Sequence, residues 1–130
     1  MLRKKVLVID DAESILMVGG ILLGGRYEVI TASNGEDGIA KARAERPDVI
    51  LLDLVMPGMD GLETCARLRE DGATGSIPII LVSARAARET LALAERIGVS
   101  DYVAKPINGA VLVAKIEQQL GAKGGSAAGC

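Results

Sequence analysis

The chain has 130 residues, enough for one domain that buries about two thirds of the surface exposed by its unfolded form, without a disulfide or a metal to hold it together. Fifteen Lys and Arg residues against 17 Asp and Glu residues give a formal net charge of −2, which offers no electrostatic reason to expect nucleic acid or an anionic membrane as a direct partner. The chain has no histidine, which excludes imidazole metal ligands, a Ser-His-Asp triad and a phosphohistidine of its own.

The cysteine content and the hydropathy pattern indicate a cytoplasmic location. Cys65, inside a predicted helix, and Cys130 are too few for a disulfide framework and lack metal-ligand spacing. The first residues lead directly into a strand-like run at Val6, without the apolar segment of a signal peptide. The longest apolar stretch, 15–23, is too short to span a bilayer. We therefore expect a cytoplasmic protein without membrane insertion.

In chain order, short strands alternate five times with helices. The predicted strands cover residues 6–9, 27–31, 49–52, 79–82 and 101–104. The first, third and fourth are continuously apolar, as parallel strands covered on both faces are, whereas the other two are shorter or more polar, as edge strands tend to be. This pattern predicts an α/β fold with a five-stranded parallel sheet and helices on both faces.

Sequence signals also mark the ends of the helices. Asn34, Asp60 and Asn108 are placed to cap helical segments of about 10 to 13 residues, with Glu63 completing a capping box after Asp60. Glycines at 24–25, 72 and 98 follow helical segments, where a residue with left-handed backbone is favourable. Composition predicts one domain over residues 1–120 and a flexible tail or truncated linker over residues 121–130.

The first helical segment, 15–23, is apolar almost all round. It carries Gly19 and Gly20 in its middle, each of which costs about 1 kcal/mol relative to alanine. Close packing against a neighbouring element would explain the glycines. Alternatively, the helix presents an apolar face to a partner or to a second copy of the chain.

Polar side chains that can take part in catalysis or ligand binding follow four of the five predicted strands. These residues are Asp10 and Asp11, Asp53, Ser83 and Lys105. In a parallel α/β sheet, the ligand site lies outside the carboxyl ends of the strands, at the switch in strand order. We therefore expect these side chains to meet at one edge of the sheet.

Each of these residues alone also has a purely structural explanation. Asp10 or Asp11 could cap the first helix, and Asp53 could belong to the turn at 57–58. Ser83 could be another cap, and Lys105 a solvated lysine. These explanations would have to hold independently at four strand ends, so we interpret the residues as one site.

The chemistry of this cluster narrows the set of functions that the site can have. Carboxylates held within a few ångströms repel one another unless a cation compensates. Hard oxygen ligands without His or Cys suit Mg²⁺, which leaves room for phosphate oxygens. With Mg²⁺ and the Lys105 ammonium beside it, an ionised Asp53 is suited to attack a phosphoryl group and form an aspartyl phosphate.

Four motifs carry a family resemblance: Ile-Asp-Asp at 9–11, Leu-Asp-Leu-Val-Met-Pro-Gly-Met-Asp-Gly at 52–61, Val-Ser-Ala at 82–84 and Ala-Lys-Pro at 104–106. Over roughly residues 4–120 the chain resembles the receiver domain of response regulators, the CheY-like phosphoacceptor of two-component signalling. The resemblance implies a flavodoxin-like sheet with strand order 2-1-3-4-5. It also implies a signalling domain, not a conventional enzyme, that assists its own phosphorylation and dephosphorylation.

The resemblance implies a role for each acidic residue. Asp53 would be the phosphoacceptor. Asp11 and Asp53 would bind Mg²⁺ directly, together with the backbone carbonyl of Val55, and Asp10 would bind it directly or through water.

The remaining roles concern the switch. Lys105 pairs with the phosphoryl group, Ser83 stands at the position of a switch hydroxyl that is frequently threonine, and Tyr102 stands at the position of the switch aromatic residue. The resemblance further implies that the phosphoryl donor is a phosphohistidine of a separate sensor histidine kinase or phosphotransfer protein. It also implies that the face formed by the fourth helix, the fifth strand and the fifth helix signals to a downstream protein or to a missing output domain.

Three other functions remain open. A phosphatase or phosphomutase with an aspartyl nucleophile would use similar residues. Such an enzyme usually has an acidic residue two positions after the nucleophile, and that position is Val55 here. A receiver fold that no longer accepts phosphate would be an interaction module. A flavin or nucleotide binder needs a phosphate-cradling loop after the first strand, where Asp10 and Asp11 would repel phosphate.

Overall fold

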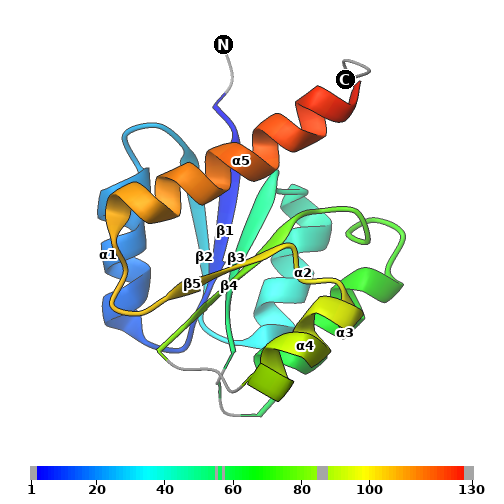
Figure 1. Cartoon of the computed structure of the whole chain (residues 1–130). Helices are drawn as coiled ribbons and strands as arrows, with labels where there is room; N and C mark the ends of the chain where they lie inside the picture. Colours follow the sequence, from blue (N-terminus) through cyan, green and yellow to red (C-terminus); the bar gives the residue numbers. More distant parts are fainter. Residues whose placement is uncertain (1–2, 55, 57, 85–87, 128–130) are drawn as a thin grey trace.

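Five parallel strands form one sheet in the order β2-β1-β3-β4-β5, which confirms the predicted topology (Figure 1). The computed structural model describes residues 3–54, 56, 58–84 and 88–127, with side chains as far as Gly121. The strands are β1 (Lys5–Ile9), β2 (Glu28–Ala32), β3 (Val49–Asp53), β4 (Ile79–Ser83) and β5 (Asp101–Ala104). The helices are α1 (Glu13–Leu23), α2 (Gly35–Glu45), α3 (Gly61–Glu70), α4 (Arg88–Ile97) and α5 (Gly109–Ala127).

The sheet lies between two layers of helices. Alternate residues of β1 point to opposite faces: Leu7 and Ile9 belong to the core under α2, α3 and α4, whereas Val6 and Val8 belong to the core under α1 and α5. Every residue of β3 and β4 is buried, as the continuous apolar runs predict. In Figure 1, α5 crosses one face of the sheet beside α1. Among the described helices, none combines the length and hydropathy needed to cross a bilayer.

The predicted helix starts are confirmed. In each case a side-chain oxygen accepts the backbone N–H three residues later, at 2.8 Å for Asn34, 2.9 Å for Asp60 and 3.1 Å for Asn108. These bonds satisfy N–H groups that have no partner within the helix. They place the first turn of α2, α3 and α5 at defined residues.

The predicted helix ends are only partly right. Gly98 has the expected left-handed backbone, with φ of +122°. The prediction is wrong for 24–25 and 72, because positive φ among the described residues is confined to Arg46, Gly58 and Gly98. After α3, a side chain satisfies a carbonyl at the helix end without a left-handed residue: the Thr74 hydroxyl donates to the Leu68 carbonyl at 2.6 Å. After α1, Gly24 stays right-handed, with φ of −62°.

The last helix is longer than composition suggests. α5 continues to Ala127, into the segment predicted as a tail. The domain boundary at residue 120 stays a prediction, and residues 128–130 lie outside the described residues.

The two glycines inside α1 differ in their surroundings. A Cβ built on the buried Gly19 would lie 3.7 Å from a Val8 methyl group, an ordinary contact distance. A Cβ built on Gly20 would meet nothing within 4 Å. Close packing within the chain therefore does not explain Gly20.

Tyr27 connects the start of β2 to α5. Its ring is 4% exposed, and its hydroxyl donates to Glu117 at 2.6 Å. Burial, followed by the hydrogen bond to Glu117, raises the pKa of Tyr27 from 10.0 to about 12. Because the folded state holds this proton more tightly, the stabilisation is fully present below about pH 10 and is lost as the pH rises through about 12.

The pKa of Tyr27 can be measured by direct titration. In a Tyr102→Phe variant, Tyr27 is the remaining tyrosine, and its phenolate absorbance is expected to appear with a midpoint of about 12 in the folded chain. The same variant unfolded in urea serves as the control, with a midpoint near 10.0. Equal midpoints in the two states would contradict the Tyr27–Glu117 bond.

Candidate functional site

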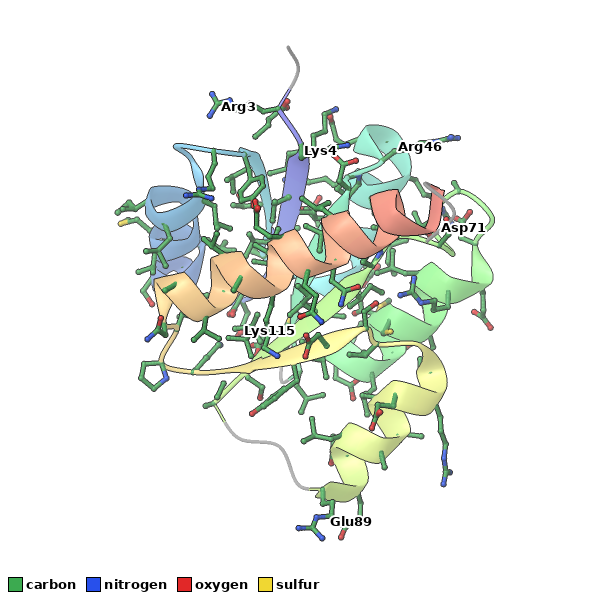
Figure 2. All side chains as sticks on the ribbon, turned by 45° about the horizontal axis from the view of Figure 1, so that its top comes forward. Arg3, Lys4, Arg46, Asp71, Glu89 and Lys115 are labelled. Atoms are coloured by element: carbon green, nitrogen blue, oxygen red, sulfur yellow. The ribbon has the colours of Figure 1, made fainter. Side chains whose placement is uncertain are left out.

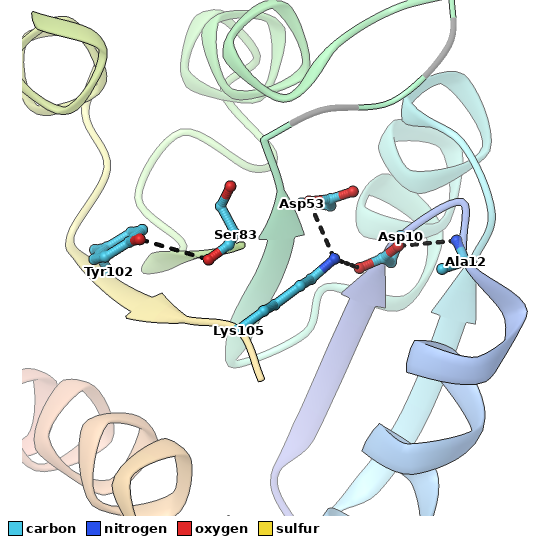
Figure 3. A network of polar contacts seen from close by, with 6 residues as sticks. All are labelled: Asp10, Ala12, Asp53, Ser83, Tyr102 and Lys105. Carbon is cyan, nitrogen blue, oxygen red and sulfur yellow. Dashed lines mark hydrogen bonds and ion pairs between the residues drawn. The ribbon is translucent and has the colours of Figure 1, made fainter. Parts of the chain in front are cut away.

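The predicted polar residues meet at the carboxyl edge of the sheet (Figure 3). Asp10 directly follows β1, Asp53 is the last residue of β3, and Lys105 directly follows β5. The Lys105 ammonium donates to Asp10 Oδ2 at 2.9 Å and to Asp53 Oδ1 at 3.4 Å. Three chain segments far apart in sequence thus contribute to one ion-pair network.

Three carboxylates form the acidic part of the site. Oxygens of Asp10, Asp11 and Asp53 lie within 4.8 Å of one another. Asp10 is 1% exposed and Asp53 is 6% exposed, whereas Asp11 is exposed to solvent. The site therefore combines two buried carboxylates with one that is exposed to solvent.

A backbone contact orients Asp10. Its Oδ1 accepts the N–H of Ala12 at 2.9 Å, which leaves Oδ2 for Lys105. Ala12 itself, with extended backbone, is the N-cap of α1 and makes no side-chain cap bond. The alternative in which Asp10 or Asp11 is the N-cap of this helix is therefore not observed.

Gly61 brings the start of α3 against the end of β3. Its N–H donates to the Leu54 carbonyl at 2.9 Å. A Cβ at this position would lie 2.2 Å from the Asp53 carbonyl oxygen and 2.7 Å from Leu54 Cα, both backbone atoms. Only glycine allows this approach, so Gly61 helps to set where Asp53 lies.

We expect Gly61→Ala to destabilise the fold by about 2 kcal/mol, because the backbone of β3 or α3 has to move. The measurement is urea unfolding followed by circular dichroism. The matched control is Gly72→Ala, because a Cβ there meets nothing within 4 Å, and we expect its effect to be neutral or mildly stabilising. Equal stability of the two variants would contradict the close approach.

The Lys105 ammonium is held between the carboxylates. Burial alone lowers the pKa of Lys105, but the hydrogen bond to Asp10 and the charges of Asp10 and Asp53 outweigh burial and raise it above its usual value. Its side chain is 18% exposed. A fixed positive charge therefore faces the acidic cluster.

Ser83 and Tyr102 lie next to this network. Ser83 ends β4 and is 2% exposed, and its carbonyl accepts the N–H of Lys105 at 2.8 Å. The Tyr102 hydroxyl approaches the same carbonyl at 3.5 Å (Figure 3). Tyr102 also lines a cavity of about 210 Å³ between α4 and β5, together with residues that include Leu91, Ala94 and Val99.

The structure thus brings together the predicted site residues that it describes. They are Asp10, Asp11, Asp53, Ser83, Tyr102 and Lys105. Val55 lies outside the described residues, so the metal ligation predicted for its carbonyl stays a prediction. The donor set of carboxylate oxygens, in a chain without histidine, fits a hard divalent cation such as Mg²⁺.

Sequence reasoning missed two contributors to the site. Gly61 follows the Asp60 cap and reads as an ordinary first-turn residue, and its contact with Asp53 depends on the tertiary fold. The N–H of Ala12 could have been found, because an Asp side chain often accepts the N–H two residues later.

The sheet order and the acidic edge define a flavodoxin-like α/β protein with its site at the carboxyl ends of the strands. Residues 6–117 match the family model described as "Response regulator receiver domain". The chain belongs to this family, and it is therefore a receiver domain of two-component signalling.

Several relatives support this assignment. Protein PilH of Pseudomonas aeruginosa is 34% identical over 117 residues, covering 89% of this chain and 97% of PilH. Response regulator PleD of Caulobacter vibrioides is 38% identical over 86% of this chain, which spans 25% of PleD. Chemotaxis protein CheY4 of Vibrio cholerae is 33% identical, with a TM-score of 0.85 over 91% of this chain and 99% of that structure. The chain thus covers PilH and CheY4 almost completely and the longer regulator PleD only in part.

Proposed function

We propose that Asp53 accepts a phosphoryl group from the phosphohistidine of a partner kinase or phosphotransfer protein, in a reaction that depends on Mg²⁺. The observation that carries this proposal is the cluster of three carboxylates, with oxygens within 4.8 Å of one another, beside the Lys105 ammonium, which lies 3.4 Å from Asp53 Oδ1. An acyl-phosphate site needs both a carboxylate nucleophile and positive charge for the phosphoryl oxygens.

The chemical step is a transfer between two groups. The bond from an Asp53 oxygen to phosphorus forms, and the bond from phosphorus to the donor imidazole nitrogen breaks, after which the imidazole takes up a proton. Bound Mg²⁺, held by Asp11, Asp53, the Val55 carbonyl and Asp10 directly or through water, would neutralise charge on the phosphoryl oxygens. Lys105 supplies the second positive charge, because its ammonium already lies beside Asp53.

We propose that phosphorylation switches the face formed by α4, β5 and α5. The phosphoryl group adds close to two negative charges beside Lys105 and near Ser83, whose hydroxyl can donate to it. Tyr102 contacts the Ser83 carbonyl and borders the cavity beside α4, so it is placed to respond. On the same face, Lys115 of α5, which is labelled in Figure 2, pairs with Asp101 of β5 at 2.9 Å. The signal would pass to a downstream protein or an output domain in the cytoplasm.

The test uses acetyl phosphate as a small phosphoryl donor. We expect intact-mass spectrometry to show one added phosphoryl group with Mg²⁺ present and none when EDTA removes the metal. A phosphorylated histidine kinase panel gives the second arm, because some receivers could accept only from a protein donor. No adduct from either source would contradict the proposal and favour a phosphate-independent interaction module.

The same preparation tests the enzymatic alternative. A phosphatase would release inorganic phosphate continuously from p-nitrophenyl phosphate, whereas a phosphoacceptor domain is expected to show no such turnover. Phosphatases of this kind usually carry an acidic residue two positions after the nucleophile, and that position is Val55 in this chain. Val55 therefore favours the absence of turnover.

A further inference from the structure

The guanidinium of Arg69 joins the end of α3 to the turn that follows α4. Its Nε and Nη2 donate to the Gly98 carbonyl at 3.0 and 2.7 Å. Its Nη1 donates to the carbonyls of Gly75 and Ile77 at 3.1 and 2.6 Å. The planar fork of arginine can serve several acceptors at once. One half-buried side chain therefore fixes both the loop before β4 and the end of α4 relative to α3.

The backbone at Gly98 fits closely against Arg69. Gly98 has φ of +122°, and a Cβ built on it would lie 2.7 Å from Nε and 3.0 Å from Cδ of Arg69. The guanidinium also lies at the C-terminal end of α4, where the helix dipole is negative. The contact between Arg69 and Gly98 is therefore favourable in shape and in charge, and a side chain at position 98 would displace it.

Further hydrogen bonds hold the same end of α4. The N–H groups of Gly98 and Val99 both donate to the Ala94 carbonyl at 3.0 Å. The N–H of Ser100 donates to the Ile79 carbonyl of β4 at 2.7 Å. The end of α4 is thus held against both α3 and the sheet.

The rest of α4 is packed much more lightly. The structure describes every residue of this helix, and Ala94 is the one that is buried. Glu89 and Leu93 are exposed, and Leu91 lines the cavity of about 210 Å³ that lies between the helix and β5. Figure 2 shows the start of α4, marked by Glu89, at the border of the molecule. A segment with few buried contacts opens locally at low free-energy cost.

The two ends of α4 face opposite edges of the sheet. The helix begins after Ser83, the last residue of β4 at the carboxyl edge, and ends before Asp101, the first residue of β5 at the opposite edge. The lightly packed half of α4 is therefore the half nearer to the candidate site.

We propose that Arg69 is an anchor for α4, so that the helix moves about its C-terminal end and the movement is confined to the half nearer to the site. Hinges of this kind consist of a few residues at the end of an element. Tyr102 lines the cavity between α4 and β5, so the movement changes the space that is open to its ring. This inference does not depend on the proposed phosphoryl transfer.

The anchor is tested by amide hydrogen exchange, measured residue by residue by NMR without Mg²⁺ or a phosphoryl donor. In the unmodified chain, the N–H of Val99 is expected to be at least about tenfold better protected than the N–H of Leu93. Arg69→Met is expected to remove this difference, with a loss of protection of at least about tenfold at Val99. The loss at Leu51 of β3, which reports global stability, is expected to be smaller.

The matched control is Arg67→Met, because Arg67 lies on the same helix and its side chain is 57% exposed. Its substitution is expected to leave the protection of Val99 unchanged. If Arg69→Met does not fold, Arg69→Lys takes its place: lysine keeps the charge but lacks the fork, and the protection of Val99 is expected to fall by at least about threefold.

Three results would overturn the anchor. The first is a Val99 amide no better protected than that of Leu93 in the unmodified chain. The second is unchanged protection of Val99 in the folded Arg69 variant. The third is an equal loss of protection at Val99 and Leu51, because Arg69 would then contribute only to global stability.

Discussion

Asp53→Asn is expected to lose phosphoryl acceptance completely while folding at least as stably as the unmodified chain. Asparagine has nearly the same shape but lacks the anionic oxygen that attacks phosphorus. The substitution removes one of three mutually repelling carboxylates, and Lys105 keeps its contact with Asp10 at 2.9 Å. We therefore expect an unchanged or slightly higher free energy of unfolding without Mg²⁺.

The measurements are intact mass after incubation with acetyl phosphate and Mg²⁺, and urea unfolding. The matched control is Asp11→Asn, which removes a carboxylate of the same cluster that is not the nucleophile. We expect Asp11→Asn to bind Mg²⁺ at least about tenfold more weakly and to become phosphorylated slowly. An adduct on Asp53→Asn at the normal rate would assign the phosphoryl group to another residue.

Lys105→Met is expected to lower the stability of the metal-free chain by about 3 kcal/mol, because removing one partner leaves buried carboxylates without their cation. The Asp10 and Asp53 side chains are only 2% and 7% exposed. Mg²⁺ is expected to restore much of the loss, since a divalent cation binding the folded state replaces the missing charge. The variant should also bind Mg²⁺ more tightly, because a competing cation has been removed.

These changes can be followed by urea unfolding with and without Mg²⁺. Lys115→Met is the control, because it breaks a more exposed pair with Asp101, with side chains 31% and 23% exposed, and should cost less than about 1 kcal/mol. If Lys105→Met is as stable as Lys115→Met, or if Mg²⁺ does not stabilise it, the electrostatic account of the site is wrong.

The sheet and the site were predictable because their signals are local. Continuous apolar runs identify the buried strands β1, β3 and β4, and a parallel sheet forces their carboxyl ends to one edge. Asp10, Asp53 and Lys105 could therefore be placed together before any contact was known. Their burial and the division of the Lys105 hydrogen bonds between two carboxylates depend on packing and had no sequence signal.

Tertiary contacts decide the features that were predicted wrongly or missed. Gly72 does not reverse the backbone after α3, because Thr74 satisfies the Leu68 carbonyl instead. Arg69 reads as a surface residue of α3, yet its guanidinium donates to the carbonyls of Gly98, Gly75 and Ile77. Those carbonyls are 6 to 29 residues away, so no local pattern could identify them.

The most direct test of the central claim is chemical trapping of the phosphorylated residue. Borohydride reduces an aspartyl phosphate to homoserine, which peptide mass spectrometry locates in the chain. After treatment with acetyl phosphate and Mg²⁺, the account predicts homoserine at position 53 and unmodified aspartate at positions 10 and 11. Homoserine at either of those two positions, or a phosphoryl adduct that yields no homoserine at position 53, would contradict Asp53 as the phosphoacceptor.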